Sequence, residues 1–260
     1  MIRVARMTYL NVAPFHWGCQ SWDVELVPCV PRELGQMAAR GAVDAGPMSV
    51  VDWFAMEQDF EPVGFYGIAT NGPVQSVLLF SLKPIESLDN AVVGVTAETA
   101  TSVQLLRLVL ERRYGLRVRA YRRGSMDGDA WLVIGDSALH EVKRGRAPFV
   151  YDLGEEWQRW QGLPFVFARW VIRRSISNAE KERFHRVLHA SFETGMARLE
   201  EIAAQCVGQG SLNANEIGAY LRNLVYRIGA DEERGLAEFK RLLDEEPRSV
   251  GSERREALSR

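Results

Sequence analysis

The chain has 260 residues, of which 47% are hydrophobic and 25% are charged, and its formal net charge is −2. This balance is typical of a globular protein with one large domain or two small ones. The small net charge excludes an overall field that draws the chain to nucleic acid or to a membrane surface. No apolar run approaches the ~20 residues that a membrane-spanning helix needs.

The cysteines and the N-terminal segment indicate a reducing compartment. Cys19, Cys29 and Cys206 are scattered without a CxxC spacing, which fits free thiols better than a disulfide framework or a zinc site. The opening segment MIRVARMTYLNVAPF lacks the apolar core of a signal peptide. We therefore expect a cytoplasmic protein.

Strands and helices alternate along the first 60 residues. Apolar runs predict strands at 2–7, 24–30 and 43–48, and a Pro-initiated helix fills 31–41. Ser49 precedes the next helix as a possible N-cap. This alternation is typical of a parallel sheet covered by helices, in which ligands bind beyond the carboxyl ends of the strands.

The remaining elements complete a second β-α-β set and a helical C-terminal end. Further strands are predicted at 60–70, 74–81, 92–96, 118–121, 131–134, 149–152 and 163–173. Helices are predicted at 103–113 and 153–161 and then, with Asn178 and Asn213 or Asn215 as caps, at 179–206, 216–228 and 232–246.

Two such sets predict an α/β protein with two lobes, joined by two crossover strands at 76–82 and 165–173. We expect residues 1–81 with 171–246 to form lobe I, residues 82–170 to form lobe II, and residues 247–260 to be a flexible tail.

Polar side chains fall where predicted strands end or helices begin. They are Asn11, Ser49, Ser76, Thr96, Thr99, Thr101, Ser102 and Asp136. Most are neutral hydrogen-bonding groups, and a site of this kind suits a small anion held by hydroxyls, amides and helix N-termini. The segment 96–102 leads from a strand into a helix, so the first helical N–H groups there can hold a carboxylate.

Each of these positions also has a purely structural interpretation. Asn11 can stabilise a left-handed turn, Ser76 can lie on a solvated strand face, and Ser49 can cap its helix. Thr101 or Ser102 can likewise cap the following helix, and Asp136 can cap whatever follows Gly135. His16 is the one histidine in a loop near these positions. The sequence contains neither a P-loop nor a GxGxxG motif, so these positions do not indicate a site for phosphoryl transfer.

Several segments resemble one enzyme family over about residues 1–245. They include TYLN at 8–11, VPRELGQMAARGAVDAGPMS at 30–49, GPVQSVLLFS at 72–81, VTAETATSVQLL at 95–106, IGDSAL from Ile134, YDLGEEWQRWQGLPFVFARWV at 151–171 and YRIGADEERGLAEF near the C-terminal end. The chain is similar here to the chorismate dehydratases of the futalosine route to menaquinone. The resemblance implies a two-lobed fold like that of type II periplasmic binding proteins.

The resemblance implies that chorismate loses water to give 3-[(1-carboxyvinyl)oxy]benzoate, and it implies no metal and no organic cofactor. On this hypothesis Thr101 and Ser102 hold one carboxylate, Ser49 and Ser76 contact the other carboxylate or the ether, and Asn11 hydrogen-bonds near the departing hydroxyl. Asp136 or a carboxylate of the substrate accepts the proton. The alternatives are 1,4-dihydroxy-6-naphthoate synthase of the same pathway and a non-catalytic protein that binds a small acid. The expected partner is the small substrate alone, in a monomer or a homodimer.

Overall fold

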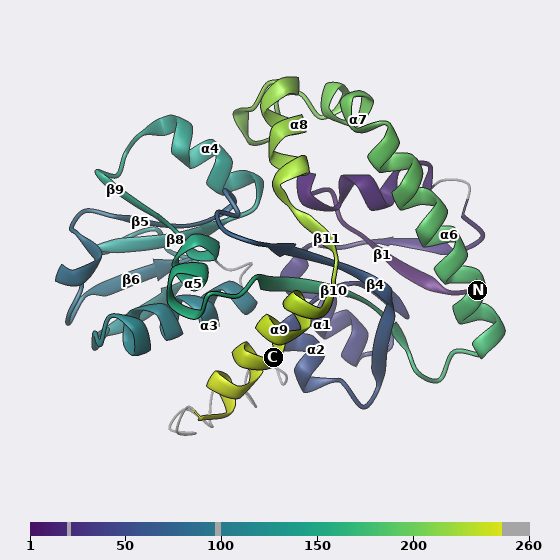
Figure 1. Ribbon diagram of the computed structural model, residues 1–260, viewed down its shortest axis with the longest axis horizontal. Coiled ribbons are helices and arrows are strands. Elements are labelled where there is room, and N and C mark those ends of the chain that lie inside the picture. Colours follow the sequence, from purple (N-terminus) through teal and green to yellow (C-terminus); the bar gives the residue numbers. More distant parts are fainter. Residues whose placement is uncertain (20–21, 97–99, 246–260) are drawn as a thin grey trace.

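The protein consists of two α/β lobes that lie side by side, as the computed structural model shows (Figure 1). The structure describes residues 1–19, 22–96 and 100–245. Each lobe contains one sheet with helices packed against it, so the predicted fold class is confirmed. The predicted tail at 247–260 lies outside the described residues.

The first lobe is built on a six-stranded sheet with the strand order β11-β4-β10-β3-β1-β2. Its strands are β1 (Arg3–Arg6), β2 (Glu25–Pro28), β3 (Ala45–Ser49), β4 (Phe60–Thr70), β10 (Phe165–Arg173) and β11 (Val225–Arg227). Strand β1 pairs in parallel with β2 and β3, as the alternation of strands and helices predicts. Strand β10 runs antiparallel to both β3 and β4, so the sheet is mixed.

The second lobe is built on a five-stranded sheet with the order β7-β6-β8-β5-β9. Its strands are β5 (Val77–Ser81), β6 (Val92–Val95), β7 (Ala120–Arg123), β8 (Ala130–Ile134) and β9 (Phe149–Asp152). Strand β6 pairs in parallel with β7 and β8, whereas β5 is antiparallel to β8 and β9. Strands β5, β6 and β8 are largely buried, which explains their continuous apolar sequences.

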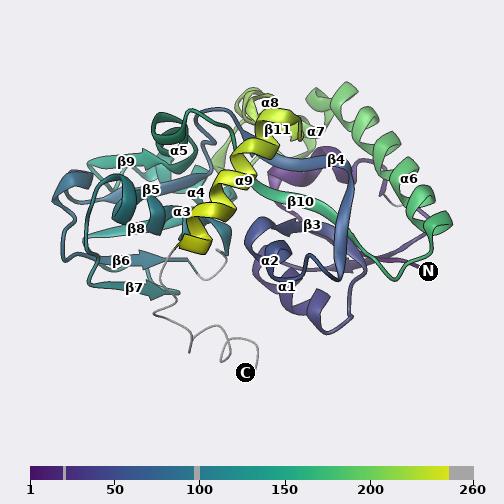
Figure 2. The ribbon, with the colours of Figure 1, turned by 60° about the horizontal axis from the view of Figure 1, so that its bottom comes forward.

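The helices cover the faces of the two sheets and the junction between them. They are η1 (Leu10–His16), α1 (Pro31–Ala39), α2 (Val50–Ala55), η3 (Ile85–Ser87), α3 (Thr101–Leu108), η4 (Val109–Arg113), α4 (Asp136–Arg144), α5 (Leu153–Gln161), α6 (Asn178–Ala197), α7 (Leu199–Gln205), η5 (Gln209–Ser211), α8 (Ala214–Asn223) and α9 (Ala230–Glu245). Figures 1 and 2 place α8 above the junction, between the two sheets. This position brings α8 close to the segments that connect the lobes.

The chain passes from one sheet to the other at different residues from the predicted crossovers. Strand β5 belongs to the second sheet, although we expected it in lobe I, and all of β10 belongs to the first sheet. The connections are therefore the segment 71–76 and the stretch from Asp152 through α5 to Pro164. The predicted lobe boundaries stay a prediction, since sheet membership is only one way to divide the chain.

The C-terminal helices differ in three details from their predicted lengths. The long helix predicted at 179–206 is interrupted at Arg198, whose φ and ψ of −115° and 32° are not helical. Ser177 caps α6 in place of Asn178, because its hydroxyl accepts the N–H of Glu180. The helix predicted at 216–228 ends at Asn223, and β11 follows it, because pairing with β4 overrides the local helical pattern.

Helix η1 is anchored firmly although it is a short 3-10 helix. The Phe15 ring stacks on Phe192 of α6 with the centroids 4.7 Å apart, and it also packs against Trp170. The hydroxyl of Ser191 donates to the Phe15 carbonyl oxygen at 2.9 Å. Gly195 lets the α6 backbone approach the Pro14 carbonyl, where any Cβ would clash. These contacts hold in place the element that carries Asn11.

Candidate functional site

A cavity of about 100 Å³ lies where residues of the two lobes meet. It has room for several water molecules. Its apolar walls come from both sheets, including Ile68 of β4, Val77 of β5 and Ile134 of β8. Five of the eight predicted site residues line it, namely Asn11, Ser49, Ser76, Thr101 and Ser102. An apolar cavity with a few convergent polar groups is the usual form of a small-molecule site.

Ser49 ends β3 and caps α2. Its hydroxyl accepts the N–H of Asp52 at 3.2 Å and donates to the Asp52 carboxylate at 2.8 Å. Burial raises the pKa of Asp52, and the hydrogen bond from Ser49 opposes that change. The capping role proposed for Ser49 is therefore confirmed. A contact of Ser49 with a ligand stays a prediction.

Asn11 occupies the second position of η1 and is half-buried at the cavity wall. Its backbone is not left-handed, since among the described residues only Gln75, Asn90 and Ser211 have a positive φ without being glycine. The interpretation of Asn11 as a left-handed turn residue is thus wrong. No described residue hydrogen-bonds its side-chain amide, which leaves that amide available to a molecule in the cavity.

Thr101 and Ser102 begin α3 and are both buried at the cavity wall. Neither is the N-cap residue of α3, because Ala100 holds that position, so the capping interpretation is wrong. The Thr101 hydroxyl instead donates to the Phe167 carbonyl oxygen at 3.3 Å and accepts the N–H of Val51 at 3.4 Å. Thr101 therefore joins the second lobe to the first at the edge of the cavity.

Asp136 lies beside the cavity without lining it. It is the first residue of α4, after Gly135, which is both the N-cap residue and part of the cavity wall. The idea that Asp136 is the cap is therefore wrong. Its carboxylate accepts the backbone N–H of Leu10 at 3.2 Å, and burial raises its pKa to about 6, against the opposing effect of that hydrogen bond. This value places the titration of Asp136 close to neutral pH.

The structure does not bring the other two predicted site residues, Thr96 and Thr99, to the cavity wall among the residues that it describes. Thr96 follows β6, where its N–H donates to the Leu132 carbonyl oxygen at 3.2 Å, and it is not among the described residues that line the cavity. Thr99 lies outside the described residues. The roles of Thr96 and Thr99 in binding stay predictions.

Sequence reasoning assigned no role in the site to Tyr9, Gly135 or Tyr220, although the first two line the cavity and the third bonds Ser76, which lines it. Tyr9 lines the cavity, and its ring would lie 2.8 Å from a Cβ atom at position 135, so only glycine fits there, with a φ of +62°. The Tyr220 hydroxyl bonds the Ser76 hydroxyl at 2.8 Å. Ser76 itself is buried, so the interpretation as a solvated strand position is wrong. No local pattern could reveal contacts between residues so distant in sequence.

The segment before Ser76 is held by Asp152, which ends β9. The Asp152 carboxylate accepts the N–H groups of Val74 at 3.0 Å and Gln75 at 2.6 Å, and also those of Gly154 and Glu155 in α5. Gln75 has a φ of 66°, which costs conformational energy in a residue with a Cβ atom. One carboxylate thus ties together both segments that connect the lobes.

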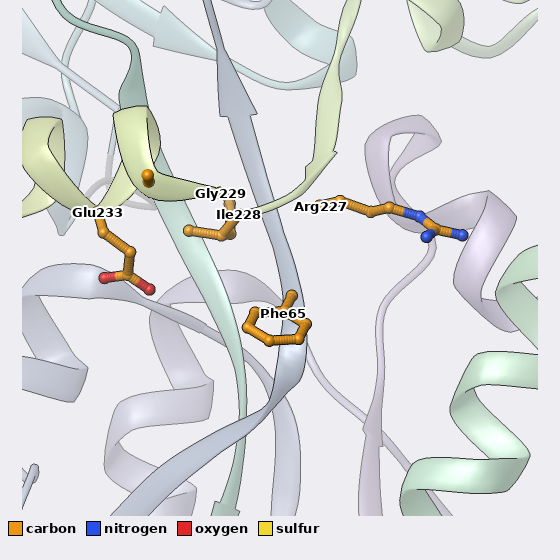
Figure 3. A pocket seen from close by; sticks show the side chains of 6 residues that line it. Phe65, Arg227, Ile228, Gly229 and Glu233 are labelled. Atoms are coloured by element: carbon orange, nitrogen blue, oxygen red, sulfur yellow. The ribbon is translucent and has the colours of Figure 1, made fainter.

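His16 and a second hollow do not contribute to this site. The Nδ1 atom of His16 lies 3.2 Å from the Met7 carbonyl oxygen, and burial lowers the His16 pKa to about 4, so the ring is neutral. The second hollow, of about 370 Å³, lies between Phe65 and the start of α9 (Figure 3). Its acidic group, Glu233, pairs with the buried Arg169, and Arg227 points away from it. The hollow therefore lacks convergent polar groups.

The described residues contain no group of three or more His, Cys, Asp and Glu side chains that could hold a metal ion. Within the same part of the chain, no helix is both long and apolar enough to cross a membrane.

Two lobes with a polar-edged cavity between them define this chain as a protein with the periplasmic-binding-protein fold. The aliphatic sulphonate binding protein SsuA of Escherichia coli is similar with a TM-score of 0.65 and 15% identity, over 94% of this chain and 86% of that chain. A protein from Archaeoglobus fulgidus is similar with a TM-score of 0.75 and 17% identity, over 94% of this chain and 96% of that one. These likenesses concern the fold alone.

Sequence comparison places the chain more narrowly. A family model described as menaquinone biosynthesis matches residues 2–245. A chorismate dehydratase of Thermus thermophilus is 30% identical over 255 residues, which cover 90% of this chain and 92% of that protein. The chain belongs to the menaquinone biosynthesis family.

Proposed function

We propose that this chain is a chorismate dehydratase, a lyase that removes water from chorismate to give 3-[(1-carboxyvinyl)oxy]benzoate in the cytoplasm. The similarity to the Thermus thermophilus enzyme supports this substrate. The observation that carries the proposal is the convergence of Asn11, Ser49, Ser76, Thr101 and Ser102 on one interlobe cavity. These uncharged groups suit a small molecule with two carboxylates, an ether and a hydroxyl.

The elimination is favourable because it produces an aromatic ring. The ring C–O bond to the hydroxyl breaks, a neighbouring ring C–H bond loses its proton, and the two leave as water. The protein therefore has to orient the substrate, exclude solvent and stabilise developing charge. In our proposal the start of α3, with Ser102 at the cavity wall, holds one carboxylate through the N–H groups of its first turn and the positive end of the helix dipole.

The opposite wall holds the remaining groups of chorismate. Ser76 and Ser49 contact the other carboxylate or the ether oxygen, and the Asn11 amide hydrogen-bonds the departing hydroxyl or the charge that develops near it. The availability of the Asn11 amide supports this role, since no described residue occupies it. Thr101 contributes by holding the lobes together at the edge of the cavity.

Two groups compete for the role of proton acceptor. Asp136 has a pKa of about 6, which suits a general base at neutral pH. It bonds the N–H of Leu10 and stands behind Gly135, so it reaches a substrate proton only through a water molecule or after a movement of the lobes. The alternative acceptor is a carboxylate of chorismate itself.

The decisive experiment is an ultraviolet assay for the aromatic product, with purified protein, chorismate and no added metal or cofactor. We expect turnover by the wild type and a loss of at least about a hundredfold in kcat for Asn11→Ala. Asn223→Ala, at the exposed end of α8, is the control and keeps wild-type activity. Full activity of Asn11→Ala would overturn the role given to Asn11.

The same assay separates the alternatives. A loss of about a hundredfold or more in kcat for Asp136→Asn assigns the proton to Asp136, whereas retained activity assigns it to the substrate carboxylate. Turnover of the later pathway intermediate instead of chorismate would favour 1,4-dihydroxy-6-naphthoate synthase. Tight binding of chorismate without any turnover would favour a binding protein.

A further inference from the structure

Helix α8 contacts the connecting segment 71–76 through two side chains on one face. Tyr220 and Asn223 are three positions apart, so they project from the same side of the helix. The Asn223 amide donates to the Pro73 carbonyl oxygen at 2.7 Å, and the Tyr220 hydroxyl lies 2.8 Å from the Ser76 hydroxyl. The first contact is exposed to solvent, whereas the second is buried.

The Tyr220 hydroxyl is a neutral hydrogen-bond donor in this environment. The residue is only 1% exposed, and a buried hydroxyl without a partner is costly. Burial raises the pKa of Tyr220 well above its usual range, and the nearby carboxylates of Asp136 and Asp152 act in the same direction. The phenol therefore keeps its proton at any physiological pH.

The bond between the two hydroxyls has a preferred direction. A phenol is a stronger acid than an aliphatic alcohol, so Tyr220 donates and Ser76 accepts. The proton of Ser76 then has to point elsewhere, and Ser76 lines the cavity while Tyr220 does not. The phenol thus directs the Ser76 proton toward the cavity.

The backbone of Ser76 is fixed independently of Tyr220. Its carbonyl oxygen accepts the N–H of Gly135 at 2.7 Å, and the preceding Gln75 is held in its left-handed conformation by Asp152. With the backbone held, the remaining freedoms at Ser76 are its side-chain rotamer and the orientation of its hydroxyl proton, and the bond with Tyr220 restricts both. Only Tyr220 among the described residues bonds this hydroxyl.

We propose that Tyr220 is a positioning residue, which orients the Ser76 hydroxyl as a donor to an oxygen of the bound substrate. This inference rests on the proposed function, because it needs a ligand with acceptor oxygens in the interlobe cavity. It makes α8, which lies in sequence between β10 and β11 of the first sheet and packs over the junction, part of the determinants of substrate affinity (Figure 2).

The test is a double-mutant cycle with Tyr220→Phe, Ser76→Ala and the double variant, assayed with chorismate. Tyr220→Phe keeps the buried ring and removes only the hydroxyl. A hydrogen bond from Ser76 to the substrate that is equally strong in the ground state and the transition state affects KM and leaves kcat unchanged. For Tyr220→Phe we therefore expect KM to rise about three- to tenfold, with kcat within about twofold of the wild type. Adding Tyr220→Phe to Ser76→Ala should change KM no further, because the residue through which it acts is gone.

Asn223→Ala is the matched control, because it removes the other contact of α8 with the same segment and leaves Ser76 alone. It should lower the urea midpoint slightly without changing KM. A merely structural role of Tyr220 would lower kcat through loss of active protein, or would raise KM equally in both backgrounds. Either result overturns the inference, as does an unchanged KM of a folded Tyr220→Phe variant.

The measurements distinguish failure of the proposed function from failure of the inference about Tyr220. If the wild type neither converts nor binds chorismate, the proposed function fails and this inference fails with it. If the wild type is active and the cycle is additive, only the inference fails. Should Tyr220→Phe not fold, replacement of Tyr220 by 3-fluorotyrosine makes the phenol a stronger donor. KM must then fall, and an unchanged KM overturns the inference.

Discussion

The Asp136 carboxylate accepts a hydrogen bond from the backbone N–H of Leu10, at 3.2 Å. This bond joins the start of α4 in the second lobe to η1 in the first, one residue from Asn11 and one from Gly135, which both line the cavity. Thr101 makes a second bond between the lobes at Phe167. Both bonds therefore connect the two lobes beside the cavity.

Asp136 should make stability depend on pH. Its pKa of about 6 in the folded protein exceeds the ordinary value of 3.8, so the folded state binds the proton more tightly than the unfolded state does. Its contribution to stability is then complete below about pH 4 and is lost as the pH rises to about 6. We expect Asp136→Asn, which cannot titrate, to lack this component. Urea midpoints of both proteins between pH 4 and 7 measure the difference, and parallel curves would contradict the prediction.

Substitutions at Thr101 and Ser102 should affect different properties, the first the stability of the protein and the second its binding of substrate. Thr101→Val keeps the shape of the side chain but leaves the Val51 N–H and the Phe167 carbonyl without this partner, so we expect a loss of about 1–2 kcal/mol in unfolding free energy. Ser102→Ala should change stability by less than about 0.5 kcal/mol, because no described residue bonds that hydroxyl. It should instead raise KM for chorismate. Urea unfolding and steady-state kinetics of the two variants test this prediction. A larger loss of stability in Ser102→Ala than in Thr101→Val, with KM raised only in Thr101→Val, would refute it.

The two glycines that flank α4 should respond differently to alanine. At Gly135 a Cβ atom would meet the Tyr9 ring at 2.8 Å, whereas at Gly145 nothing lies within 4 Å, although both have a φ near +60°. We expect Gly145→Ala to cost about 1 kcal/mol, the ordinary penalty of a left-handed alanine. Gly135→Ala should cost about 2 kcal/mol or more and lower kcat/KM as well, because Tyr9 lines the cavity. Thermal unfolding and kinetics compare the two, and equal losses would argue against the contact.

Asp152 should matter more than an ordinary helix cap. Ser177→Ala removes one cap bond, from the Glu180 N–H, together with the exposed bond to the Glu180 carboxylate, and is expected to cost about 1 kcal/mol. Asp152→Ala removes acceptors for four N–H groups in both connecting segments, so we expect a loss of about 2–4 kcal/mol. Only Asp152→Ala should also raise KM, because Gln75 and Ser76 shift together. An effect on stability no larger than that of Ser177→Ala would show that the connecting segment is held by other contacts.

Local sequence patterns predicted the positions of individual strands and helices well. The strand over 60–70 and the helix over 153–161 match β4 and α5 residue for residue, because apolar periodicity, the Asp152 cap and Gly162 are local signals. Asn11, Ser49 and the pair Thr101 and Ser102 reach the cavity from the segments that follow the parallel strands β1, β3 and β6, which chain order predicts, whereas Ser76 reaches it from the segment before the antiparallel strand β5.

The tertiary structure decided what depends on contacts between distant residues. Local patterns did not predict the break at Arg198, the formation of β11 after Asn223 or the place of β5 in the second sheet. The last two depend on strand pairing between residues that are distant in sequence. The bond between Tyr220 and Ser76 joins residues 144 positions apart. A sequence specifies the local conformations through side-chain periodicity and caps, but only the packed chain determines which hydroxyl bonds another and which one faces the cavity.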